Sequence, residues 1–316
     1  MKRASLLLAA FITVVAANQA YAETTLITLG TAGGPLPQAK RAQSSNLLIV
    51  NGTLYLIDAG GGVTGRIVQS GNNFRQVSKI FITHLHSDHD DGLATLLNSQ
   101  WEQQSPPVDI YGGGVEALVK GAIAYLQPNA DIRWSEGKKR PMAEAFRAHD
   151  IMPGVVYQDA NVKVTAAENS HFHFQPGDPA YGKYRSYSYR FETPDKVVFF
   201  TGDTGPSDIV VDLAKGADLY VTETTKPEDV VELYKRNGTW QEKTPGEQEG
   251  FLRHMHEEHV TPEDIGKMAT KAGVKAVILS HYGPSLSPDD DFQRLVDETR
   301  KFYSGPVTLA KDLMKF

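Results

Sequence analysis

Four side chains of metal-binding type lie within six residues of this chain: His84, His86, Asp88 and His89. They directly follow the apolar, β-branched run 80–83, which is typical of a buried strand, and turn-forming residues surround them. We therefore expect a loop at the carboxyl end of a strand, where α/β sheets usually place their sites. Imidazole and carboxylate without thiolate suit Zn²⁺, and also Fe or Mn. A solvated polar loop is the weaker interpretation, because three of the ten histidines gather here.

This motif resembles the signature of the metallo-β-lactamase superfamily, His-x-His-x-Asp-His directly after a strand. Later motifs extend the resemblance over most of the chain beyond residue 25. The resemblance implies an α/β fold of the αββα four-layer sandwich type. In that fold two mixed β-sheets pack together, helices lie outside, and the metal ions sit at one edge between the sheets.

Composition and the first residues indicate an exported protein. The 316 residues are 41% hydrophobic and carry a net charge of −6, which suits one large or two small soluble domains. Residues 1–22 have the pattern of a secretory signal: two basic residues, a short apolar run, and Ala-Tyr-Ala before the cleavage point. The apolar run is too short for a membrane span. We expect a signal peptide, a catalytic domain over 23–316, and a periplasmic or secreted location.

Hydrophobic periodicity predicts the elements that must position the site. Expected strands are 25–29, 46–50, 53–58, 80–83, 108–111, 162–167, 186–192, 196–201 and 277–280; expected helices are 63–69, 93–100, 115–126 and 262–272. Periodicity is lost over 128–160, which predicts a lid or an insertion. His149 lies in this segment without a second ligand in suitable spacing, so we leave it outside the site. The glycine-rich turn 30–35 is expected to be a tight loop beside the site rather than a phosphate cradle.

Three later strands also end in side chains of ligand type. Asp203 follows a buried strand, and a carboxylate there can bridge two cations. Either His171 or His173 should complete the first ion, because both follow the strand 162–167. By resemblance, His171 is the third histidine of the first ion, with His173 in reserve. Resemblance also makes Asp203 the bridging aspartate.

The last strand-end ligand is His281, which resemblance assigns to the second ion. The resulting set is two Zn²⁺ per chain, with Asp203 and a hydroxide bridging them. One ion takes the first two histidines of the motif and His171, and the other takes Asp88, His89 and His281. Asp58 either caps the helix 63–69 or, by resemblance, supports the metal-binding loop.

A second histidine-rich segment, 254–259, mimics the first. It could form a second metal site, but no buried strand precedes it, so His254 and His256 are interpreted as surface residues. By resemblance to ribonuclease and arylsulfatase relatives, His259 reaches into the site without binding metal. We therefore expect His259 to be a catalytic helper that protonates the leaving group or stabilises charge, and Asp88 to orient the hydroxide as well as bind metal.

The ligand set predicts a zinc-dependent hydrolase of small sulfate or phosphate esters. The resemblance is to the secreted arylsulfatase-like branch, which is similar to tRNA 3′-processing ribonucleases and phosphodiesterases. An anionic small molecule is the expected substrate and a homodimer one option for assembly. No nucleic acid is expected, because the chain is acidic and shows no long basic arm. A lactonase, a weak β-lactamase and a non-catalytic periplasmic zinc-binding protein remain alternatives.

Overall fold

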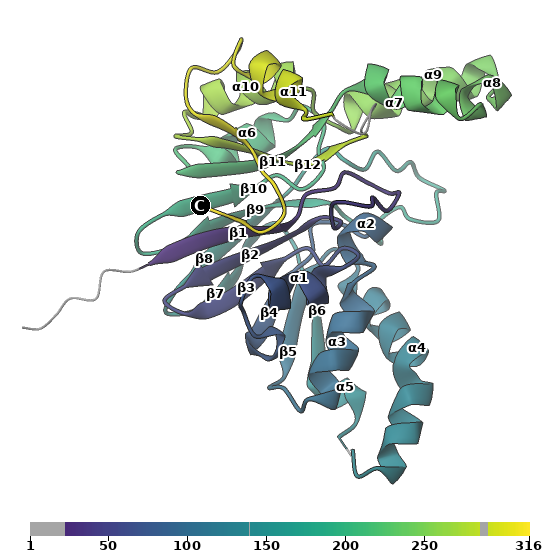
Figure 1. Ribbon diagram of the computed structural model, residues 1–316, viewed down its shortest axis with the longest axis vertical. Coiled ribbons are helices and arrows are strands. Elements are labelled where there is room, and N and C mark those ends of the chain that lie inside the picture. Colours follow the sequence, from purple (N-terminus) through teal and green to yellow (C-terminus); the bar gives the residue numbers. More distant parts are fainter. Residues whose placement is uncertain (1–22, 139, 285–289) are drawn as a thin grey trace, which may run out of the picture.

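Two β-sheets pack face to face and helices cover their outer faces (Figure 1). The computed structural model describes residues 23–138, 140–284 and 290–316, so the predicted signal peptide 1–22 lies outside the described residues. Within the described residues, seven strands form the first sheet: β1 (Thr24–Gly30), β2 (Ser45–Val50), β3 (Thr53–Ile57), β4 (Val77–Phe81), β5 (Val108–Gly112), β6 (Phe146–Asp150) and β14 (Met314–Lys315). Their spatial order is β14-β1-β2-β3-β4-β5-β6.

The second sheet has the same number of described strands: β7 (Gly154–Gln158), β8 (Lys163–Glu168), β9 (Tyr187–Glu192), β10 (Val197–Phe200), β11 (Leu219–Thr225), β12 (Val277–Gly283) and β13 (Val307–Leu309). Their spatial order is β13-β12-β11-β10-β9-β8-β7. Each sheet is half antiparallel and half parallel, with β3 to β6 parallel in the first sheet and β10 to β13 parallel in the second. The parallel halves bring several carboxyl strand ends to one edge, which is where the predicted ligands follow their strands.

The helices lie mainly outside the sheets (Figure 1). Their bounds are α1 (Val63–Gln69), the 3₁₀ helix η1 (Phe74–Gln76), α2 (Ser87–Asp90), α3 (Leu93–Glu102), α4 (Val115–Ser135), α5 (Met142–Ala145), α6 (Asp208–Ala214), α7 (Pro227–Arg236), α8 (Thr239–Glu242), α9 (Pro245–Glu257), α10 (Pro262–Ala272) and α11 (Gln293–Thr299). Helices α7 to α9 project from the body beside the second sheet (Figure 1). None of the helices in the described ranges has the length and apolar character needed to cross a membrane.

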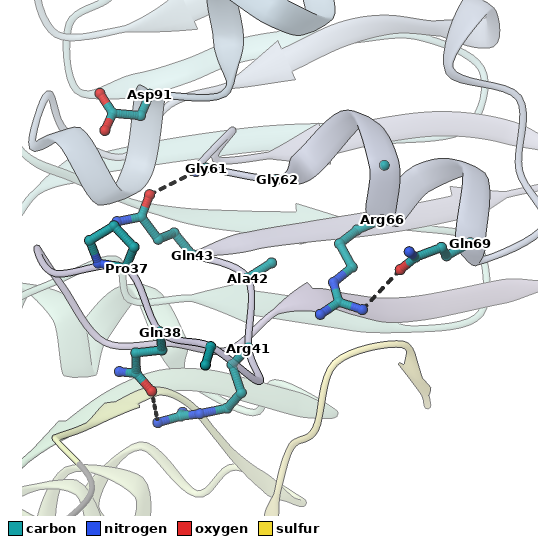
Figure 2. Close-up of a pocket in the computed structure, with 12 residues that line it drawn as sticks. Pro37, Gln38, Arg41, Ala42, Gln43, Gly61, Gly62, Arg66, Gln69 and Asp91 are labelled. Atoms are coloured by element: carbon teal, nitrogen blue, oxygen red, sulfur yellow. Dashed lines mark hydrogen bonds between the residues drawn. The ribbon is translucent and has the colours of Figure 1, made fainter.

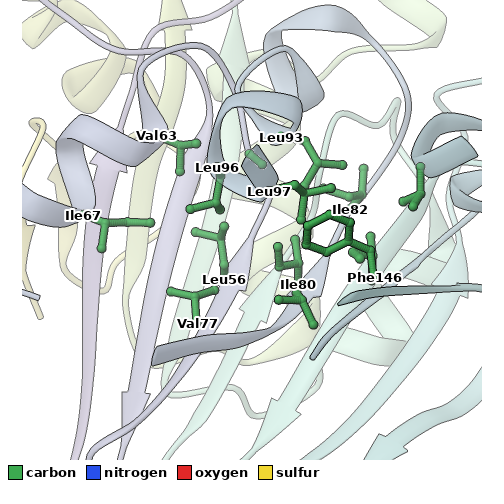
Figure 3. Close-up of a cluster of buried hydrophobic side chains, with 14 of the residues drawn as sticks. Leu56, Val63, Ile67, Val77, Ile80, Ile82, Leu93, Leu96, Leu97 and Phe146 are labelled. Atoms are coloured by element: carbon green, nitrogen blue, oxygen red, sulfur yellow. The ribbon is translucent and has the colours of Figure 1, made fainter. Parts of the chain in front are cut away.

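Strand periodicity explains the layers, because successive side chains point to opposite faces. On β3, Leu54 and Leu56 face the helices, whereas Tyr55 and Ile57 face the second sheet. Figure 3 shows the helix-facing cluster, in which residues of α1 and α3 pack on strand residues such as Ile80. A second cluster fills the space between the sheets, and a third lies under α6, α10 and α11. The predicted αββα sandwich with two mixed sheets is therefore confirmed.

The described residues of 128–160 are not the irregular segment that the loss of periodicity suggested. The segment contains the second half of α4, the short α5, the edge strand β6 and the edge strand β7 of the other sheet. Helix α4 continues through Pro128. The polar pattern of β6 arises because Arg147 and His149 both bind Asp109 on the neighbouring strand, at 2.7 and 2.9 Å. This charge pairing masked the strand in the sequence.

Candidate metal centre

The histidine loop is held by hydrogen bonds to Asp58, at the end of β3. One carboxylate oxygen of Asp58 accepts the backbone N–H of Thr83 at 2.8 Å. The other oxygen lies 2.8 Å from Nδ1 of His89, so this imidazole turns its Nε2 toward the site. Asp58 therefore orients a predicted ligand without being one, as carboxylates beside metal-binding histidines do. Its position agrees with the supporting role that the resemblance implied.

Three predicted ligands of the first ion converge on one point. Nδ1 of His86 lies 3.1 Å from Nε2 of His84 and 3.0 Å from Nε2 of His171. The other ring nitrogen of His171, Nδ1, lies 2.9 Å from the backbone carbonyl of Glu258 and donates to it, which leaves Nε2 free to bind a cation. His173, the reserve candidate, is exposed and points elsewhere, with Nδ1 3.8 Å from the carboxylate of Glu258.

The four predicted ligands of the second ion also lie together. The Asp88 carboxylate is 2.9 Å from Nε2 of His281 and 3.6 Å from Nε2 of His89. Oδ1 of Asp203 is 3.4 Å from Nε2 of His89 and 3.6 Å from Nδ1 of His281. His281 lies within β12 rather than after it, and its backbone is in the left-handed region, with φ 44°. The seven predicted ligands thus form overlapping groups. Asp203 is grouped with His84 and His89, with His171 and His259, and with Glu223 and His281, so it adjoins ligands predicted for each ion.

The donor set fits divalent cations on its own chemistry. Three buried atoms of this cluster have no hydrogen-bond partner: Nε2 of His89, Nδ1 of His281 and Oδ1 of Asp203. A buried polar atom without a partner costs free energy unless something outside the protein satisfies it. Each of these atoms is a metal donor. A ligand set of imidazole and carboxylate suits zinc.

The electrostatics differ across the cluster. Burial opposes the charge on His89 and on His281, but Asp203 and other nearby carboxylates raise the pKa of both imidazoles. Burial lowers the pKa of His84 and of His171 well below the usual value, so both imidazoles are neutral with a lone pair available. Burial opposes ionisation of Asp203, but the neighbouring His281 and His89 outweigh it and hold its pKa well below the ordinary range. Asp203 is therefore an ionised carboxylate.

The glycine-rich turn 30–35 packs against the loop, as expected. A Cβ on Gly34 would lie 2.0 Å from the carboxylate of Asp88, and one on Gly60 would lie 2.2 Å from the Asp88 carbonyl. The backbone N–H of Gly34 also approaches Nε2 of His281, at 3.3 Å. Only residues without a side chain allow this close approach. The turn thus confines Asp88 and His281.

A buried carboxylate that the sequence analysis missed lies behind the site. Glu223 is on β11, and its Oε2 is 2.7 Å from Nδ1 of His259. Its other oxygen accepts the backbone N–H of Thr204 at 2.8 Å. Nδ1 of His259 lies 3.9 Å from the Asp203 carboxylate. A single acidic residue inside the buried run 220–225 was the available signal.

The charge balance of this pair favours a protonated histidine. Burial opposes the charge on His259, but Glu223 and Asp203 raise its pKa to about 9. Burial raises the pKa of Glu223, and the adjacent His259 works against that shift. The pair therefore holds one proton on Nδ1 between the two residues and leaves Nε2 of His259 as a donor.

The other histidines of the second segment differ from each other. His256 is exposed, as predicted. His254 is half-buried: its Nδ1 lies 3.0 Å from the Glu258 carboxylate and its ring centroid 5.1 Å from that of His259. The interpretation of His254 as a plain surface residue is therefore wrong, because the end of α9 folds back against the site.

A groove of about 510 Å³ lies beside the loop 60–62 (Figure 2). Its two arginines are already paired: Arg66 lies 2.8 Å from Asp312, and Arg41 donates to the Thr31 carbonyl at 2.8 Å. Figure 2 shows that Gln43 accepts a hydrogen bond from Gly61 across the groove wall. The groove holds none of the metal-binding groups found in the described residues. It lies beside the candidate site and is not part of it.

Comparisons with known proteins agree with this geometry. A family model described as β-lactamase superfamily domain matches residues 53–282. A protein named ribonuclease Z from Mycobacterium sp. strain KMS is 29% identical over 269 residues, covering 84% of this chain and 86% of its own. The crystal structure of human tRNase Z, short form, has a TM-score of 0.62 at 21% identity and covers 92% and 98% of the two chains. The metallo-β-lactamase fold protein YhfI from Bacillus subtilis has a TM-score of 0.65 at 18% identity and covers 93% and 99%.

The expectation that nucleic acid is excluded as a partner is wrong. Its basis was an acidic net charge and the lack of a basic arm, yet relatives that align over most of the chain are named ribonuclease Z. Net charge describes the whole surface and not the charge at one binding site. Acidity therefore does not decide this question.

Proposed function

The chain belongs to the β-lactamase superfamily and is a metal-dependent hydrolase of ester bonds, and from this premise we propose that its substrates are phosphodiesters, RNA included. The observation that carries the proposal is the junction at Asp203. Two groups of metal-binding side chains meet at this carboxylate, and the protonated His259 approaches it from the other side. A tetrahedral phosphodiester offers two non-bridging oxygens, one for each group of metal-binding side chains, and a leaving oxygen for His259.

Each residue of the site has a role that follows from its position. The seven ligands would hold two Zn²⁺, which supply Lewis acidity and lower the pKa of bound water. Asp58 and the Glu258 carbonyl fix the rings of His89 and His171, so that little reorganisation is needed when substrate binds. Asp88 is confined by Gly34 and points its carboxylate into the cluster. His259, charged through Glu223, donates a proton to the departing oxygen.

A panel of substrates tests this function. Zinc-loaded protein is assayed with bis(p-nitrophenyl) phosphate, p-nitrophenyl sulfate, a chromogenic cephalosporin and an RNA with a 3′ extension, with metal content measured alongside. We expect kcat/KM for the phosphodiesters to exceed that for the cephalosporin by about tenfold or more, equivalent to about 1.4 kcal/mol. A preference for the sulfate or the cephalosporin would replace the proposal with an arylsulfatase or a β-lactamase. Tight zinc binding without turnover would indicate a non-catalytic protein.

Export remains a proposal and has its own test. Residues 1–22 have the features of a cleavable secretory signal, which supports a periplasmic or secreted location. Expression of the full chain followed by mass spectrometry should yield a mature protein that begins at Glu23. A protein that retains its first 22 residues in the cytoplasmic fraction would contradict export.

A further inference from the structure

The loop between β8 and β9 carries an aromatic pair beside the metal centre. The loop spans residues 169–186, and within it the structure contains neither helix nor strand. Hydrogen bonds fix its first residue, because Asn169 binds the backbone of Ser186 and of Thr201 at 3.0 Å. Irregular loops of this length that are anchored at both ends are often binding loops. The pair consists of Phe172 and Phe174.

The rings of the aromatic pair extend the metal centre outward. The centroid of Phe172 lies 5.0 Å from that of His171, with 29° between the planes. The ring of Phe172 also makes edge contacts with the other two ligands of the first ion. The centroid distances are 5.7 Å to His84 and 5.3 Å to His86. Phe174 continues the stack at 4.7 Å from Phe172. Phe172 thus contacts all three ligands of the first ion, of which His86 is exposed, and Phe174 lies on Phe172.

The core does not account for the aromatic pair. Both rings are only half-buried, and the three hydrophobic clusters of the described residues include neither of them. The contacts of Phe172 with the ligand rings explain why an aromatic side chain lies at that position. The same explanation does not apply to Phe174, which contacts Phe172 and lies beyond the ligands. A half-exposed ring at this position offers a face on which a planar group can stack.

We propose that the aromatic pair is a specificity platform, on which a planar aromatic ring of the substrate stacks while its phosphate lies at the metal centre. This inference rests on the proposed phosphodiesterase function and names its substrate class: esters that bear a nucleobase or an aryl ring. Stacking on an aromatic side chain is tolerant of sequence, because every base has a π-face. The platform selects for a ring and not for a particular base.

Equilibrium binding separates ring recognition from turnover. Dissociation constants of the zinc-loaded protein are measured by calorimetry for methyl phosphate, phenyl phosphate and thymidine 5′-phosphate. Phe174→Ala should weaken binding of the nucleotide, the aryl ester or both by about tenfold, the lower end of what one stacked base contributes. Methyl phosphate should change less than about twofold, because it has no ring to stack. The two ring-bearing ligands show whether a base or an aryl group is preferred.

Three further variants control the measurement. Phe174→Tyr keeps a ring and should bind like wild type. Tyr125→Ala removes another exposed aromatic side chain, on α4, and should change nothing. Phe172→Ala should weaken the binding of ring-bearing phosphates as well. Metal analysis of this variant shows whether the contact of Phe172 with the metal-binding histidines affects metal content.

The outcomes are distinct. Equal weakening of all three phosphates by Phe174→Ala would overturn the platform, as would unchanged affinities or a wild type that does not prefer rings. Ring-dependent binding in a protein that hydrolyses none of the phosphodiesters would keep the platform and overturn the proposed function. Hydrolysis of phosphodiesters without ring-dependent binding would keep the proposed function and overturn the platform.

Discussion

Two segments of this chain carry nearly the same letters, and only one of them forms the metal cluster. The first segment, 84–89, reads His-Leu-His-Ser-Asp-His, and the second, 254–259, reads His-Met-His-Glu-Glu-His. All three histidines and the aspartate of the first segment enter the cluster. Of the second, only His259 approaches a ligand carboxylate. Spacing alone therefore does not make a site.

Backbone conformation explains the difference. In the first segment His84 and His86 lie on the extended run that follows β4, where alternate side chains share a face, and Asp88 and His89 lie on the single turn α2. Residues 254–257 are the last turn of α9. In a helix, positions two apart face different sides while positions four apart share one, so His254 pairs with Glu258 and His256 faces solvent. His259 does not follow this helical periodicity, because it lies after the end of α9.

The largest expected effect concerns the junction that completes the first segment's cluster. Asp203→Ala removes the carboxylate shared by both ligand groups, and the rate with a phosphodiester should fall about thousandfold, matching several kcal/mol of lost charge stabilisation. Metal content, measured by plasma mass spectrometry, should fall with it. Asp203→Asn is the matched control for shape. Full occupancy in the alanine variant would contradict the junction role.

The next effect isolates the one functional residue of the second segment. His259→Ala removes a proton donor and not a ligand, so turnover should fall about a hundredfold, within the range of general acid catalysis, while metal content stays near wild type. Glu223→Gln should give a similar loss, because His259 then lacks the carboxylate that holds its charge. Loss of metal in His259→Ala would assign His259 to the metal cluster, and loss of metal in Glu223→Gln would assign Glu223 to it.

A smaller effect tests how the first segment is held. Asp58→Ala removes the hydrogen bond to Nδ1 of His89 and the one to the Thr83 backbone. Zinc affinity, measured by competition with a chelator, should fall by about 10–100-fold, as for other carboxylates that support a ligand. Asp109→Ala, a carboxylate remote from the cluster, is the matched control. An unchanged affinity would contradict the supporting role of Asp58.

Much of the fold and of the first segment could be predicted because the signals are local. A run such as 80–83 is apolar at successive positions, and the ligands follow it within six residues. Strand β6 was not recognised within 128–160, because Arg147 and His149 find their partner on β5, which periodicity does not reveal. Glu223 was missed for the same reason, since its partner is 36 residues away. Pairing between distant elements is what a single sequence leaves open.

The smallest effect compares two histidines of the second segment that differ only in the side of α9 they occupy. His256→Ala removes an exposed side chain, so stability should change by less than about 0.5 kcal/mol and kcat/KM by less than about twofold. His254→Ala removes a ring packed on His259 and the partner of the Glu258 carboxylate. Because the carbonyl of Glu258 orients His171, we expect a loss in kcat/KM of about threefold to fivefold, equivalent to less than about 1 kcal/mol. Steady-state rates, metal analysis and thermal unfolding of both variants test this difference. If either variant loses zinc, the second segment contains a metal ligand, and the contrast between the two segments no longer holds.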